Sequence, residues 1–161
     1  MTTLMSIGTP AVKPTDDGSA GQPRADLRAA IGLAPAEVRR LILGPCRDAL
    51  DLVHAYLPAS EQVSAILPLK PVIMDGTTNS LLILTNWRLV FVAPAPQAIS
   101  WPLTDVTKFQ YVVGGLGSVI VHAAGGEFML GGDHDVGPYG TTFGAVVKSA
   151  VTVAILSQRM T

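Results

Sequence analysis

Three adjacent polar residues near the end of the sequence form the densest cluster that could do chemistry. Asp133, His134 and Asp135 stand between Gly131-Gly132 and Val136-Gly137. Two carboxylates and an imidazole could bind a metal ion or move a proton. Adjacent residues of a strand point to opposite sides, so only a tightly folded loop would bring these side chains together. We therefore expect a hydrophilic loop before the last helix, without a metal or catalytic site.

A second candidate is a pair of opposite charges, Arg88 and Asp105. Arg88 begins a predicted strand, and Asp105 precedes the strand that starts at Val106. The two side chains could recognise a ligand, or they could form a structural ion pair that clamps a hairpin to the next strand. We favour the structural ion pair.

The other reactive residue types give no sign of an enzyme. His54 lies in a helical pattern and His122 in a strand pattern, both far from any serine or cysteine in a nucleophile context, so no catalytic triad is predicted. The Gly114-Gly115-Leu116-Gly117 segment lacks the lysine and the following helix of a phosphate-binding loop, and it is predicted to join two strands. Cys46 is the single cysteine and cannot form an internal disulfide; a buried side chain is favoured over a reactive thiol.

Composition excludes several classes of protein. The chain has 161 residues, of which 48% are hydrophobic and 14% charged, and its net charge is −1 from 11 basic and 12 acidic residues. That balance leaves no excess of positive charge for nucleic-acid phosphates. So few charges on an apolar chain suggest that a partner chain covers part of its surface. The first residues carry no secretory signal, and the apolar run at 143–156 is too short to span a bilayer, so we expect a cytoplasmic protein.

The chain divides into three parts by pattern. Residues 1–24 are rich in Thr, Pro, Gly and Asp and predict a flexible arm, which could instead become ordered against a neighbouring subunit. Residues 25–58 have apolar positions at steps of three and four and predict a helical extension, broken at Gly44-Pro45. Residues 59–161 have the alternating pattern of a β domain.

Seven short strands and one helix are predicted in this last part. The strands cover residues 63–69, 80–85, 88–93, 98–101, 106–113, 118–124 and 127–130, with Asn86-Trp87 as a tight turn. In the fifth strand, Thr107, Phe109, Tyr111 and Val113 are expected on one side. The helix spans about 141–157, although its many β-branched residues would also suit a strand. The fold class is therefore α+β, mainly β, as a sandwich or partly open barrel.

The last helix is expected to close one end of this barrel. The side chains that would fill the opening are Phe143, Val146, Val147, Ala150, Val153 and Ala154.

A longer motif gives the fold a more specific interpretation. The segment Leu81–Val92 reads LLILTNWRLVFV, and Ile99–Val106 reads ISWPLTDV. Together they resemble bacterial pleckstrin-homology-like domains of the YokE and GRAM-related kind, in which a hairpin L-x-L-T-x-x-R-L-x-F is followed by I-x-x-x-L-x-D-I/V. Thr85, Arg88 and Asp105 are the distinctive positions. The resemblance covers residues 57–157 and implies seven strands in two bent sheets capped by a helix.

Such domains bind lipids, peptides, other proteins or their own copies, so the fold alone does not decide the function. The resemblance implies a basic cluster near the first hairpin in phosphoinositide-binding members, and here that segment has only Lys70, opposed by Asp75. Trp87, at a predicted hairpin tip, is a candidate contact anchor, although its ring could instead fold back onto the sheet; Trp101 ends the predicted strand 98–101.

We expect a non-catalytic interaction module without a cofactor, which contacts a protein partner or forms a homo-oligomer; a subunit of a bacterial or phage particle remains one version. The alternative is peripheral lipid or small-ligand binding at the open end of the barrel, with Lys70, Asp75, Trp87 and Arg88 as binding residues.

Overall fold

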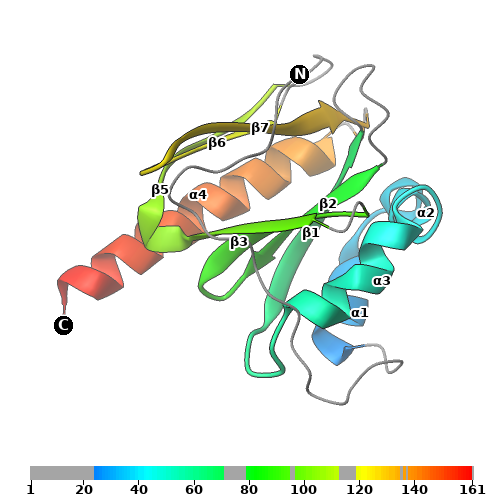
Figure 1. Cartoon of the computed structure of the whole chain (residues 1–161), viewed down its shortest axis with the longest axis horizontal. Coiled ribbons are helices and arrows are strands. Elements are labelled where there is room, and N and C mark those ends of the chain that lie inside the picture. Colours follow the sequence, from blue (N-terminus) through cyan, green and yellow to red (C-terminus); the bar gives the residue numbers. More distant parts are fainter. Residues whose placement is uncertain are drawn as a thin grey trace.

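The structure is a computed structural model of the whole chain (Figure 1). It describes residues 24–70, 79–94, 97–112, 119–134, 136 and 138–160, without the side chains of Gln97 and Asp133. Residues 1–23 of the predicted arm, Asp75, Val113, the glycines at 114–117 and Asp135 lie outside the described residues.

Three short helices form the first part. They are α1 (Ala25–Leu33), α2 (Ala36–Leu43) and α3 (Arg47–Tyr56). Pro35 occupies the N-cap position of α2, and the Gly44-Pro45 turn separates α2 from α3, because proline removes a backbone donor that a continuous helix requires. The predicted break between two abutting helices is confirmed.

Seven antiparallel strands follow. They are β1 (Val63–Lys70), β2 (Ser80–Thr85), β3 (Arg88–Ala93), β4 (Gln97–Pro102), β5 (Val106–Tyr111), β6 (Val119–Ala123) and β7 (Gly126–Asp133), with a short 3-10 helix, η1 (Leu103–Asp105), between β4 and β5. Their order across the sheet is β4-β3-β2-β1-β7-β6-β5. The structure thus confirms an α+β, mainly-β fold.

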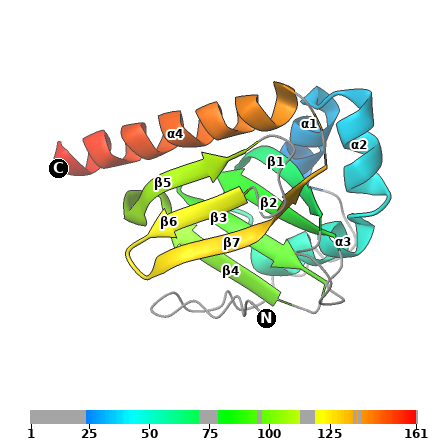
Figure 2. The same cartoon turned by 90° about the horizontal axis from the view of Figure 1, so that it is seen from above.

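The sheet bends over so that its two halves face each other. The half β1–β4 meets the half β5–β7 at the end of β1, where Leu69 and Lys70 pair with Asp133 and Gly132 of β7. Across the interior, the Trp101 ring of β4 lies 5.2 Å from the ring of Phe128 in β7, centroid to centroid. Figure 2 shows the two layers from above.

The helices α1–α3 cover the outer face of the first half of the sheet, as Figure 1 shows. One face of β2 lies between the two halves of the sheet, and its other face lies under the helices. All six residues of β2 are therefore buried. Leu27, Val38 and Val53 of the helices belong to the same continuous apolar core as the strands.

The prediction that Thr107 and Phe109 lie on the same side of β5 is wrong. Phe109 is buried, but Thr107 is exposed, so they do not share a face. A register irregularity between Val106 and Lys108 inserts an extra residue opposite β6 and turns Thr107 outward.

The last helix, α4 (Pro138–Arg159), is a helix and not a strand. It packs through Phe143 and Val147 against β5 and η1, and the Phe143 ring lies 6.0 Å from that of Phe109. Val146 and Val153 were expected in this contact, but both are exposed, because they lie about 60° and 80° around the helix from Phe143, on the side away from Val147.

The C-terminal half of α4 extends beyond the sheet (Figure 2). By length and composition α4 could span a membrane, with a mean hydropathy of 1.4. Its Phe143 side is nevertheless packed on the sheet.

Candidate functional site

The turn between β2 and β3 brings together the residues that the sequence motif singled out. Thr85 ends β2, Asn86 and Trp87 form the turn, and Arg88 begins β3. The Thr85 hydroxyl accepts hydrogen bonds from the backbone N–H groups of Trp87 and Arg88, at 3.3 and 3.1 Å. The side chain of Thr85 therefore holds the tight turn in place.

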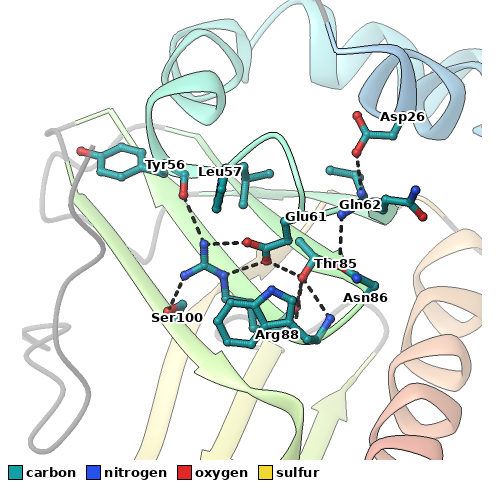
Figure 3. Close-up of polar contacts among 12 residues, drawn as sticks. Asp26, Tyr56, Leu57, Glu61, Gln62, Thr85, Asn86, Arg88 and Ser100 are labelled. Carbon is teal, nitrogen blue, oxygen red and sulfur yellow. Dashed lines mark hydrogen bonds and ion pairs between the residues drawn. The ribbon is translucent and has the colours of Figure 1, made fainter. Parts of the chain in front are cut away.

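Arg88 forms a buried ion pair with Glu61 at this turn (Figure 3). Arg88 Nε donates to Glu61 Oε2 at 2.7 Å, and Arg88 Nη2 donates to Oε1 at 2.9 Å. The pair is thus bidentate, and the Glu61 side chain is 0% exposed against 9% for Arg88. The Thr85 hydroxyl lies 2.6 Å from Glu61 Oε2, so the carboxylate has three partners.

Two more donors of the guanidinium are bonded as well. Nη2 also donates to the Tyr56 carbonyl at 3.2 Å, and Nη1 donates to Ser100 Oγ at 3.3 Å. One face of the group lies 4.9 Å from the centroid of the Trp87 ring. Arg88 therefore joins the end of α3, the β2–β3 turn and β4, and it has little capacity left for a ligand.

The predicted Arg88–Asp105 ion pair is wrong, because Arg88 forms its ion pair with Glu61 instead. Asp105 ends η1 and is exposed, whereas Arg88 points inward to Glu61. Glu61 lies in the segment between α3 and β1, and nothing in its local pattern marks it as the partner. In the sequence Glu61 stands out only as an acidic residue just before an apolar strand.

A second polar network fastens α1 to the same segment. Arg24 donates to both carboxylate oxygens of Asp26 and to the carbonyls of Leu57, Pro58 and Glu61. Partial burial alone would raise the pKa of Asp26, but hydrogen bonds from Arg24 and from the Val63 N–H outweigh it and hold the pKa below its ordinary value.

The predicted ligand-binding residues do not converge. In the β1–β2 ladder Val63 pairs with Thr85 and Leu69 pairs with Ser80, so Trp87 and Lys70 lie at opposite ends. Six residues of strand separate these ends by about 20 Å. Both side chains are exposed, but they cannot contact one small ligand together. Asp75 lies outside the described residues.

Trp87 remains the main exposed residue of the site. Its side chain is 49% exposed, whereas Trp101 is fully buried. The hairpin-tip position leaves one face of the indole in solvent while Arg88 covers part of the other. An amphipathic ring held in this way is a typical contact anchor.

A cavity of about 390 Å³ lies elsewhere, between α2 and the end of β7. It is lined by Glu37, Arg40, Leu41, Pro45, His134 and Val136. The sequence cluster around His134 thus contributes one imidazole here, next to a carboxylate and a guanidinium of α2. Within the described part of the chain, no three His, Cys, Asp or Glu residues gather as a metal site would require.

The remaining candidate residues have structural surroundings. Burial raises the pKa of Cys46 to about 11, and its Sγ contacts the Ser80 carbonyl at 3.5 Å. The thiol is therefore protonated at neutral pH and buried, as predicted. His122 lies 2.7 Å from Gln110 Oε1 and 3.2 Å from Glu127 Oε1, both on neighbouring strands.

A scan against protein-family models found no match, and searches of curated proteins and of solved structures found none either.

Proposed function

We propose that residues 57–157 are a pleckstrin-homology-like domain that acts as a non-catalytic interaction module and contacts other protein chains. Two observations support the domain assignment. The seven antiparallel strands follow the order β4-β3-β2-β1-β7-β6-β5 and end in one closing helix. Thr85 and Arg88, two of the three motif positions, organise the β2–β3 turn through their own side chains.

The distribution of exposed apolar side chains carries the functional part of the proposal. The large apolar residues exposed in the described part of the chain are Leu33, Leu43, Trp87, Val112, Val146, Val153, Leu156 and Met160. Half of them belong to α4 or directly follow it, and Trp87 stands at a hairpin tip. Apolar side chains exposed along one helix and at a hairpin tip are typical of a protein contact. The polar side chains of the β2–β3 turn, in contrast, bond to Glu61 and to backbone groups of the protein itself.

Site-specific photo-cross-linking in the native host tests this proposal. A photoreactive amino acid replaces Trp87 or Val153, and the matched control carries it at Arg47, which is exposed on α3. We expect protein adducts, with a second copy or with another chain, from position 87 or 153 and not from position 47. No adduct from either position, or equal adducts from all three, would refute the proposal.

Small-ligand binding is a second candidate, and the α2–β7 cavity is the observation that favours it. Arg40 and His134 offer positive or hydrogen-bonding groups to a small anionic or zwitterionic molecule, and Leu41 and Pro45 offer apolar contact. Native mass spectrometry of the chain purified from its host tests this: a bound small molecule that Arg40→Ala removes supports the candidate. A bare polypeptide mass would contradict it.

A further inference from the structure

The helix α4 has a second apolar face that nothing in the described structure covers. Its members, which we call the α4 stripe, are Val146, Val153, Leu156 and the directly following Met160, which are 40, 60, 52 and 87% exposed. At about 100° per residue, these four fall within a strip about 80° wide. The strip is centred about 120° from the midpoint of the buried residues Phe143 and Val147.

The spacing of the α4 stripe matches the seam of a two-stranded coiled coil. Val146, Val153 and Met160 are seven residues apart, as a positions of a heptad are, and Ser149 and Leu156 are the intervening d positions. The stripe contains no charge, since the charged residues of α4 are Lys148 and Arg159, on another side. A helix that lies in a membrane surface needs a strongly cationic polar face and usually aromatic anchors, and two cations do not provide it.

We propose that the α4 stripe binds the α4 stripe of a second copy of this chain as an antiparallel helix pair, with the two-fold axis near Val153. This arrangement sets Val146 against the partner's Met160 and Leu156 against the small Ser149 and Ala150 of the partner subunit. Large side chains then face small ones along the seam. A parallel pair would set Ser149 against its own copy and leave a gap in the packing.

The size of the stripe decides how strong this dimer is. With the axis at Val153 the facing segments run from Val146 to Met160, about 21 Å, and a strip of about 10 Å width on each of the two helices is about 420 Å² in total. Stable interfaces bury about 1,200–2,000 Å². We therefore expect a weak, reversible dimer that is mostly monomeric at low micromolar concentration. The inference rests on the proposed function and identifies the protein partner as a second copy of this chain.

Sedimentation velocity of the full chain, from about 5 µM to about 1 mM, tests this inference. The variant Val153→Glu places a charge at the centre of the seam. Its control, Gln158→Glu, places the same charge on an exposed f position, on the side of the helix away from the seam. We expect the wild type and Gln158→Glu to approach the mass of two chains, and Val153→Glu to associate at least about tenfold more weakly. Equal association of the two variants, or a monomeric wild type, would overturn the inference.

Cysteine cross-linking tests the direction of the pair, and buried Cys46 gives no background. A mixture of Val146→Cys and Met160→Cys chains is expected to form mixed disulfides, while Val146→Cys alone is not. Cross-linking of Val146→Cys with itself would refute the antiparallel arrangement.

The failures of the two proposals differ. A monomeric wild type whose photo-cross-links reach another protein overturns the inference and leaves the proposed function in place. If the wild type is monomeric and no protein adduct forms, both the inference and the proposed function fail. If the wild type is monomeric and floats with anionic vesicles, and Val153→Glu abolishes this flotation, the α4 stripe binds a membrane and not a second copy of the chain.

Discussion

Removing the charge of Glu61 is expected to destabilise the whole fold. In Glu61→Gln the guanidinium of Arg88, which is 9% exposed, loses its bidentate carboxylate and keeps the Tyr56 carbonyl, the Ser100 hydroxyl and one amide oxygen. Breaking one side of a buried pair costs about 3–5 kcal/mol, and the remaining acceptors favour the lower end, about 3 kcal/mol. For a chain of this length that lowers Tm by roughly 6–12 °C.

Denaturant unfolding followed by far-UV circular dichroism measures this loss. The internal control is Asp51→Asn, which breaks the exposed Arg47–Asp51 pair, 59 and 63% accessible, and is expected to cost less than about 0.5 kcal/mol. The double variant Glu61→Gln with Arg88→Met removes both charges, so it should cost less than the sum of the single changes by about 2 kcal/mol or more. A loss below about 1 kcal/mol for Glu61→Gln, or strictly additive effects, would refute the clamp.

Further predictions concern α4, Cys46 and Trp87. Gly144→Ala should raise the free energy of unfolding by about 0.5–1 kcal/mol, because a Cβ there meets only ordinary contacts. Gly140→Ala should lower the free energy of unfolding by about 1–3 kcal/mol, because its Cβ overlaps the Tyr111 ring. Thermal melts of the two variants test both predictions. Cys46 should resist iodoacetamide at pH 8 until the chain unfolds. The pKa of Cys46 is about 11 in the folded chain and 9.0 ordinarily, so the thiol ionises first in the unfolded chain. The free energy of unfolding should therefore fall as the pH rises from 9 to 11, and denaturant unfolding at each pH measures this fall. Trp87→Ala should cost less than about 1 kcal/mol, because the ring is half exposed, but should weaken partner capture.

Local signals predicted the strands well. The bounds of β2 and β3 agree with the prediction, because Asn86-Trp87 is a compact turn between two apolar runs. The proline-broken helices were predictable for a similar reason, since proline acts on its own turn.

Long-range pairing was not predictable in the same way. The partner of Arg88 is Glu61, 27 residues away, and only the register between β1 and β2 brings the two together. The same register separates Lys70 from Trp87. Because α4 has apolar residues on two faces, its periodicity alone could not show which face is buried, and Val153 was assigned to the wrong one.

Nuclear magnetic resonance of methyl-labelled full-length chain during dilution most directly tests whether the protein works through its outer surface. We expect concentration-dependent shifts at the methyl groups of Val146, Val153 and Leu156, and none at buried Val147. Shifts confined to residues around the α2–β7 cavity, or spectra that stay constant at every concentration while no protein partner binds, would contradict this account.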